Sequence, residues 1–276
     1  DISLGEAVEQ VLASKSYSAQ ELRELYFSLN TTIEHEYSGA LADISLYEVD
    51  QGEDWPGEDV IFPQGYSQVM DGLAEGLDIR LGHVAQAISY DQRDGVTVTA
   101  NHGVFHGDYA VVTLPLGVLQ SGAVQFSPPL PDRKQTALQH LDMGILNKVY
   151  LHFPNVFWDR EHEMLGYVSE HRGQWAEYLN IHFYTGAPIL LAFNAADYGL
   201  QIEALADEDI IAGVMTVLQR IYGDAIPQPD GWLITRWGTD PFAGGSYSYI
   251  RPHGSGDDLD ALAESLDNIL FFAGAG

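Results

Sequence analysis

The chain has 276 residues, no cysteine, 40 acidic and 12 basic side chains, and a formal net charge of −28. The absence of cysteine excludes disulfides, thiolate catalysis and cysteine-based zinc sites, and the acidic balance argues against nucleic-acid binding. Attraction of cationic ligands is one consequence of this charge. The plainer explanation of the excess of acidic side chains is solubility, or adaptation to a salty cytoplasm.

Hydrophobic residues make up 46% of the chain, which is enough to bury the core of one large or two smaller domains. No apolar run is long enough to span a bilayer, and no basic segment precedes an apolar one as in a secretory signal. We therefore expect a soluble protein, with the cytoplasm favoured. Because the sequence starts at Asp1 without Met, we interpret it as a processed or excised piece.

The first predicted elements are helices separated by a loop. Ser18 and Glu21 form a capping box before a run of apolar residues at helical spacing. The acidic, turn-rich stretch 48–60 predicts an exposed loop. In 62–77 a Gly-Tyr turn leads into a short helix with apolar residues on one face.

The next section is rich in predicted strands. An Asp94-Gly95 turn between 79–90 and 96–100 predicts a β-hairpin. Further strands are expected at 109–119 (stopping at Pro115), 146–153, 187–195, 231–238 and 268–276, and a helix at 207–223 with Asp207 as N-cap and Gly223 as C-cap.

Lys148 is the most informative single charge. Strand periodicity places it on one face with Leu146, Tyr150 and His152. Lysine is rarely fully buried without a partner or a task, and desolvation would lower its pKa and suit it to handle a proton or position a water. The alternative is an edge-strand lysine that reaches solvent.

The stretch 236–250 reads R-W-G-T-D-P-F-A-G-G-S-Y-S-Y-I and carries four aromatic side chains around a glycine-rich turn. Three roles are open for these rings: core packing, stacking on a flat cofactor, or caging a cation. Gly244 and Gly245 would let the backbone approach a ligand closely. The four rings belong to Trp237, Phe242, Tyr247 and Tyr249.

Several common catalytic motifs are missing from the sequence. There is no H-E-x-x-H, so we predict no metal site, and there is no G-x-S-x-G motif. No G-x-G-x-x-G follows a strand near the N-terminus, so the usual dinucleotide fingerprint is also missing.

Several segments occur in an order that is hard to attribute to chance. They are F-P-Q-G-Y-S-Q-V-M-D-G-L-A-E-G-L, T-L-P-L-G-V-L, F-S-P-P-L-P with L-N-K-V-Y-L-H-F, R-W-G-T-D-P-F-A-G-G-S-Y-S-Y, and L-F-F-A-G. This set resembles the flavin-containing amine oxidases over residues 60–276, most closely the branch with polyamine oxidases and lysine-specific histone demethylases.

The resemblance implies an α/β (mixed α+β) fold: a substrate lobe with a mixed β-sheet flanked by helices, plus part of a two-lobed FAD-binding fold. It divides the chain into a helical part of the substrate lobe (1–60), a middle strip of the FAD lobe (61–120), the substrate-binding lobe (121–266) and the start of a last FAD-lobe segment (267–276). It also implies FAD-dependent oxidation of an amine C–N bond, by hydride transfer to flavin, giving an imine, then aldehyde, amine and hydrogen peroxide.

Site residues follow from the same resemblance. Lys148 matches the family lysine that holds a water against flavin N5. Trp237 matches the tryptophan beside the isoalloxazine, and Tyr247 matches one wall of the cage that orients the amine. Phe242 is expected to pack, and the role of Tyr249 stays open. The expected cofactor-binding residues are Ala85 on the adenine side, Thr113, Leu114 and Pro115 along the flavin, Trp237, and Gly274.

The sequence departs from the family at both ends. It lacks the dinucleotide-binding unit, and F-F-A-G is not followed by the usual Glu. We therefore expect a cofactor-free fragment that needs the missing FAD-lobe segments or a partner chain, with a small cationic amine as substrate and neither nucleic acid nor membrane as partner. The lack of a long heptad run disfavours histone demethylation.

Two other functions stay as alternatives. One is a non-catalytic module, derived from an amine oxidase, that binds amines or a partner protein. The other is oxidation of amino acids or carotenoid-type substrates. An amino-acid oxidase would need an arginine clamp for the carboxylate, and neither Arg236 nor Arg251 is convincingly placed for it, so this alternative ranks third.

Overall fold

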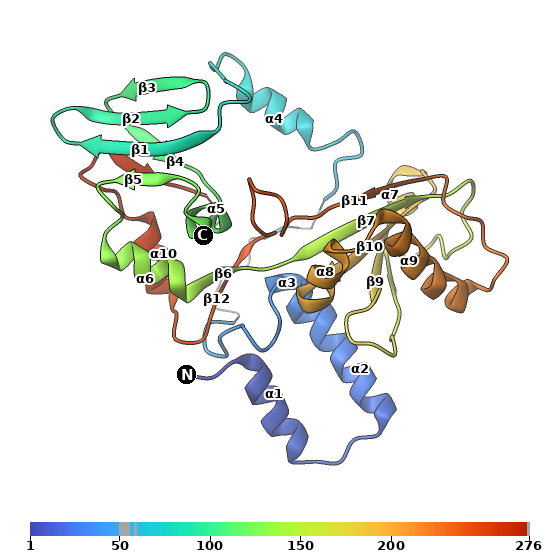
Figure 1. Cartoon of the computed structure of the whole chain (residues 1–276). Helices are drawn as coiled ribbons and strands as arrows, with labels where there is room; N and C mark the ends of the chain where they lie inside the picture. The colour runs from blue at the N-terminus through green and yellow to red at the C-terminus, as the bar shows by residue number, and fades with distance from the viewer. Residues whose placement is uncertain (50–55, 58–59, 275–276) are drawn as a thin grey trace.

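The computed structural model describes residues 1–49, 56–57 and 60–274. The fold is mixed α+β, and two β-rich regions lie side by side (Figure 1). A two-stranded ribbon of β6 (Leu141–Met143) and β12 (Ser248–Ile250) lies between them. Within the described part of the chain, no helix has the length and apolar character needed to cross a membrane.

One region, here the small-sheet region, is built around a four-stranded sheet of order β3-β2-β1-β5. The hairpin predicted around Asp94 and Gly95 is confirmed, because β1 and β2 pair antiparallel. β5 pairs parallel with β1, and a separate parallel pair joins β4 and β13. The strands are β1 (Ala85–Asp91), β2 (Gly95–Ala100), β3 (Gly103–Gly107), β4 (Ala110–Val112), β5 (Gln125–Ser127) and β13 (Leu270–Phe272).

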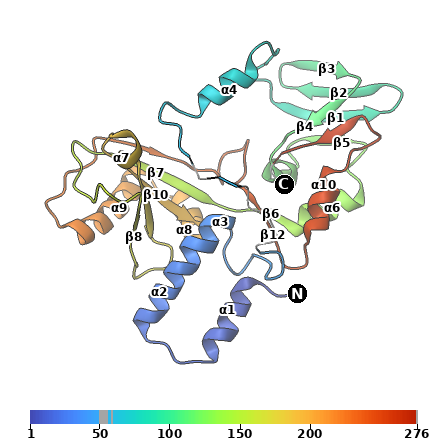
Figure 2. The same cartoon turned by 180° about the vertical axis from the view of Figure 1, so that it is seen from behind.

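Helices complete the small-sheet region. Three of them, α5 (Leu116–Ser121), α6 (Asp132–His140) and α10 (Gly256–Ala263), pack together around buried Leu116, Ala137 and Ala261. The fourth, α4 (Ser67–Ala74), is set apart from these three (Figure 2). Because β5 hydrogen-bonds to β1, the sheet extends past the expected boundary at residue 120. The division into four functional ranges stays a prediction.

The other region, the large-sheet region, contains an antiparallel five-stranded sheet of order β11-β7-β10-β9-β8. Val149 and Leu151 are fully buried in a core with α9, whereas Lys148 and Tyr150 lie on the opposite face, as the alternation predicted. The elements are β7 (Leu146–His152), β8 (Met164–Gly166), β9 (Glu177–Asn180), β10 (Ile189–Ala195), β11 (Gly231–Ile234), α7 (Ile181–Thr185), α8 (Ala196–Glu203) and α9 (Asp207–Tyr222).

The chain begins with two helices that extend away from the sheets (Figure 2). The predicted capping box is confirmed: Ser18 Oγ accepts from the Glu21 backbone at 3.2 Å, and the Ser18 backbone donates to the Glu21 carboxylate at 2.7 Å. A π-helix then leads into one short turn beside the large sheet. These elements are α1 (Leu4–Ala13), α2 (Ala19–Leu29), the π-helix η1 (Asn30–Glu34) and α3 (His35–Tyr37).

Several predicted limits were wrong. The strand at 109–119 is only Ala110–Val112, and after Pro115 the chain turns into α5, because proline suits the start of a helix. Ala206, not Asp207, is the N-cap of α9. Four elements are shorter than predicted. β1 begins only at Ala85 and β11 ends already at Ile234. α4 covers only Ser67–Ala74, and β13 covers only Leu270–Phe272.

The loop predicted at 48–60 lies largely outside the described residues. The helix that follows it was predicted to have an apolar face, and that face is open to solvent. Met70 is 46% exposed and Leu73 is 68% exposed. An amphipathic pattern identifies the helix, but it does not guarantee that the same chain covers its apolar face.

Candidate functional site

Lys148 lies in the middle of β7, on the face of the large sheet that α9 does not cover. Burial lowers the pKa of its ammonium group from the usual 10.5, as expected when a charge is desolvated. Its strand partner in β10 is Phe193, whose own partner in β9 is Glu177. Directly paired residues share a face, so Lys148, Phe193 and Glu177 form a row across the sheet.

Trp237 belongs to the segment that continues β11 alongside Lys148. The Lys148 backbone donates to Thr235 Oγ1 at 2.8 Å, and the Thr235 backbone donates to the Lys148 carbonyl at 3.0 Å. Trp237 follows two residues later and is 38% exposed. The structure therefore places the predicted lysine and tryptophan on neighbouring segments.

Tyr247 is fixed at both its backbone and its hydroxyl. The Tyr247 carbonyl accepts from the Gly144 backbone at 2.9 Å and from Ser38 Oγ at 3.1 Å, and its hydroxyl donates to the His35 carbonyl. Burial is the main cause that raises the pKa of this phenol, so the ring stays neutral over the physiological range. Such a ring offers a rigid aromatic surface.

The other two rings of the aromatic stretch differ from each other. Phe242 was expected to pack, but it is 62% exposed. The reason is that Gly244, at φ +71°, turns the loop tightly against Gly117 of α5, and Phe242 lies outside this contact. Tyr249, which the sequence left open, is buried, and its ring lies against Gly39.

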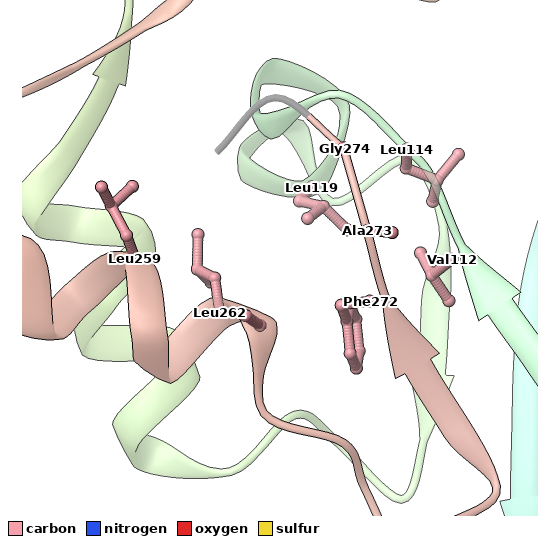
Figure 3. Close-up of a pocket in the computed structure, with 9 residues that line it drawn as sticks. Val112, Leu114, Leu119, Leu259, Leu262, Phe272, Ala273 and Gly274 are labelled. Atoms are coloured by element: carbon pink, nitrogen blue, oxygen red, sulfur yellow. The ribbon is translucent and has the colours of Figure 1, made fainter. Parts of the chain in front are cut away.

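The expected flavin residues gather where two parallel strands end. β4 leads into Thr113, Leu114 and Pro115, and β13 leads into Gly274. The Ala273 backbone donates to the Val112 carbonyl at 3.0 Å. Leu114 and Gly274 line one pocket with leucines of α10 (Figure 3). Ligands of α/β folds commonly bind outside the carboxyl ends of strands.

Ala85 and Leu114 meet in a second, larger groove. It has a volume of about 750 Å³ and runs from the segment before β1 to Phe242. Its walls are mainly apolar. They include Leu81, Val84, Leu114, Val118, Val124 and Phe242, with Arg80, His83 and Gln86 as polar members.

These residues fit a large flat ligand such as FAD. The groove offers apolar walls for ring systems with few polar groups, as cofactor sites do. Gly274 has a φ of +146°, and a Cβ placed there would lie no closer than 3.8 Å to Thr113, so the backbone is open to a ligand. Ala85, Leu114 and Gly274 are thus placed together, whereas Lys148, Trp237 and Tyr247 belong to the neighbouring large-sheet side.

Both arginines that were considered as a carboxylate clamp pair with acidic side chains of this chain. Arg236 donates to Asp207 at 2.7 Å and to the Leu205 carbonyl at 3.0 Å, and Arg251 pairs with Asp142 at 3.4 Å. His102 precedes strand β3, whereas His106 lies within it and its Nδ1 is 2.9 Å from Thr97 Oγ1. Among the described residues, no three His, Asp or Glu side chains gather as metal ligands.

The fold and these residues agree with one protein class. The family of flavin containing amine oxidoreductases matches residues 7–276, and the chain belongs to it. The similarity that the sequence motifs suggested is therefore confirmed.

Individual relatives carry more specific names. Lysine-specific histone demethylase 1 homolog 3 of Oryza sativa subsp. japonica is 37% identical over 285 residues, covering 99% of this chain and 35% of that protein. Protein FLOWERING LOCUS D of Arabidopsis thaliana is 35% identical, covering 99% and 36%. The chain thus spans about a third of the length of these relatives.

A solved structure shares the fold. Putrescine oxidase, in its wild-type form bound to putrescine, aligns with a TM-score of 0.65 at 21% identity, covering 76% of this chain and 47% of that one. This likeness supports the mixed α+β architecture of FAD-dependent amine oxidases.

Some residues of the site escaped the sequence analysis. Glu177 and buried His35 form a pair at 3.0 Å (Nδ1 to Oε2), and the His35 ring lies 5.9 Å from that of Phe193. Asn147, beside Lys148, is fully buried. A polar residue at a core position of a strand was the one signal available for Asn147. No local pattern pairs His35 with Glu177, 142 residues apart.

Proposed function

We propose that this chain supplies the substrate side of an FAD-dependent amine oxidase that acts on a polyamine or a related cationic amine. The observation that carries the proposal is the row of Lys148, Phe193 and Glu177 on the sheet face that α9 does not cover. It combines an aromatic surface and a carboxylate, which suit a cationic ligand, with a lysine whose pKa is lowered by burial.

FAD, when bound, would supply the hydride acceptor for C–N oxidation. Ala85, Thr113, Leu114, Pro115, Trp237 and Gly274 would hold it. Lys148 would keep a water or a proton at Nζ, a role that its lowered pKa favours. Trp237 and Tyr247 would orient the amine, since aromatic faces attract ammonium groups by about 0.5–2 kcal/mol each.

Glu177 would bind the ammonium that does not react. It lies two strands from Lys148, and two strand spacings amount to roughly 10 Å. This separation is comparable to the span of an extended polyamine. His35, hydrogen-bonded to Glu177, would fix the direction of the carboxylate.

FAD binding would need FAD-lobe segments beyond this chain, or a partner chain. The first test is a visible absorption spectrum of the purified chain before and after adding FAD. We expect no structured flavin band from the chain alone. A band would contradict the need for further segments, and binding of amines without any flavin would favour a non-catalytic module.

The role of Lys148 is tested in a flavin-complete protein, meaning this chain joined to the missing FAD-lobe segments. Lys148→Met should slow flavin reduction or reoxidation by about 10²–10⁴-fold, the usual contribution of a proton-handling group. Lys15→Met is the control, because Lys15 is exposed between α1 and α2. Unchanged rates for both half-reactions in Lys148→Met would refute its role.

The choice of amine is tested through Glu177. Glu177→Gln should raise KM for spermidine or putrescine at least tenfold and leave KM for a monoamine unchanged. Glu161→Gln, an exposed site outside the row, is the control. The similarity to proteins named histone demethylases favours a second substrate, methylated lysine in a peptide. Preference for such a peptide over spermidine would replace the polyamine proposal.

A further inference from the structure

A buried polar pair lies directly behind the row on the large sheet. Asn147 is fully buried in β7, and Glu203, at the end of α8, is 7% exposed. Asn147 Nδ2 donates to Glu203 Oε1 at 2.6 Å. Buried polar groups of this kind need specific partners, because an unpaired one has lost its hydrogen bonds to water without replacement.

The two side chains of this pair form hydrogen bonds mainly with the backbone of the segment that carries Trp237. Asn147 Oδ1 accepts from the Trp237 backbone at 3.2 Å and from Thr235 Oγ1 at 3.1 Å. The two Glu203 oxygens accept from the backbones of Gly238 and Thr239, each at 2.9 Å. Three consecutive N–H groups, at 237–239, are thus satisfied by two side chains.

These bonds replace a β-ladder that has ended. β11 stops at Ile234, and Thr235 is the last residue whose N–H donates to the backbone of β7, at the Lys148 carbonyl. The N–H groups at 237–239 need other acceptors, because backbone donors of folded proteins are almost always paired. Gly238 lets the segment approach closely: a Cβ there would lie 2.8 Å from Ile145 and 3.0 Å from Glu203 Oε2. The path of the chain through Trp237 therefore depends on Asn147 and Glu203.

We infer that Asn147 and Glu203 are positioning residues that together set where Trp237 lies relative to Lys148. Asn147 precedes Lys148 in β7, and Thr235 Oγ1 bridges the two, accepting from the Lys148 backbone and donating to Asn147. One network thus fixes both residues. Its effect on turnover rests on the proposed function, whereas its effect on Trp237 does not.

The matched control is Asn180, another fully buried asparagine of the same sheet. Its Oδ1 accepts from Trp158 Nε1 at 2.8 Å, and its Nδ2 donates to the carbonyls of Asp159 and His162. Asn147→Ala and Asn180→Ala remove equivalent side chains, so they should destabilise the fold similarly while disturbing different tryptophans.

Fluorine NMR of the chain labelled with 5-fluorotryptophan separates these effects. The five tryptophans give separate signals, and Trp237→Phe assigns one of them. Asn147→Ala should shift or broaden the Trp237 signal, and Asn180→Ala should move that of Trp158. An unmoved Trp237 signal in Asn147→Ala, or an equal change in Asn180→Ala, would overturn the inference.

A charge exchange tests the pair if Asn147→Ala does not fold. Glu203→Gln places an amide where an N–H donor needs an acceptor, and Asn147→Asp places two carboxylates face to face. Each should move the Trp237 signal. The double variant, in which the introduced amide donates to the introduced carboxylate, should bring the signal back toward its original position. If the shift of the Trp237 signal in the double variant equals the sum of the shifts in the two single variants, the residues do not act as a pair.

Turnover gives the last readout. In the flavin-complete protein, Asn147→Ala should slow flavin reduction about a hundredfold, the effect of misplacing a group by about 1 Å, and Asn180→Ala should change it less than threefold. Equal slowing by both would refute the positioning role. If the unmutated flavin-complete protein oxidises no amine, the proposed function fails, while the NMR comparison still decides the inference.

Discussion

The two regions of the molecule differ in how fully they bury their apolar side chains. In the large-sheet region Val149, Leu151 and Leu190 are 0% exposed against α9. In the small-sheet region Leu81 is 86% exposed and Tyr109 67% exposed. Both regions have a buried core, but the small-sheet region also presents apolar side chains such as Leu81 along the groove that suits a flat cofactor.

The largest expected effect is on stability, and it contrasts the same substitution in the two regions. Leu151→Ala should lower the free energy of unfolding by about 2–5 kcal/mol, because it leaves a cavity in a filled core. Leu73→Ala in α4 should change it by less than about 0.5 kcal/mol, because Leu73 is 68% exposed. Urea unfolding of both variants measures the difference. Equal losses would mean that the apolar face of α4 is covered in the folded protein.

The sequence predicted best what depends on local pattern. The alternation in 146–153 identified β7 and the face of Lys148, and the capping box at Ser18 located α2. These signals are local because neighbouring residues of one element create them. The family motifs added the site residues, of which Ala85, Leu114 and Gly274 meet along two pockets.

The sequence could not predict features that arise between distant segments. Asn147 and Glu203 are 56 residues apart, and neither lies in a recognisable motif. Whether Phe242 packs or is exposed depends on where its loop contacts α5, which is a tertiary property. In the sequence, the apolar face of α4 has the same pattern as a buried face, because the pattern does not say which chain covers it.

The second prediction concerns how the small-sheet region is held together. Lys134 is 2% exposed, and its Nζ donates to the Ala261 and Leu262 carbonyls at 2.9 and 2.6 Å, at the end of α10. The ammonium also lies 4.0 Å from the centre of the Phe272 ring. Burial lowers the pKa of Lys134 from 10.5 to about 8.

This shift makes stability depend on pH in a defined direction. Below about pH 8 Lys134 is protonated in both the folded and the unfolded chain, so the full cost of burying its charge lowers the free energy of unfolding. Between about pH 8 and 10.5 the unfolded chain binds more protons, so stability should rise with pH, by up to about 3 kcal/mol at 1.36 kcal/mol per unit of pKa. Lys134→Met should lack this rise in urea unfolding followed over pH. Parallel curves for the two proteins would contradict it.

The smallest expected effects concern the contact that joins the two regions. A Cβ on Gly117 of α5 would lie 2.7 Å from the Ala243 carbonyl oxygen and 2.8 Å from that of Gly244. Gly117→Ala should therefore force the loop that carries Phe242 away from α5 and destabilise the protein by about 1–3 kcal/mol. Thermal unfolding measures the loss.

Gly72 of α4 provides the opposite case. It is also helical, but a Cβ there meets nothing within 4 Å, so Gly72→Ala should stabilise the helix by about 0.5–1 kcal/mol. Helix propensity favours alanine at both positions, so a difference in sign reports the contact between α5 and the loop. A stabilising Gly117→Ala would show that the loop moves freely over α5, and the two regions would then be joined through the β6–β12 ribbon rather than through this contact.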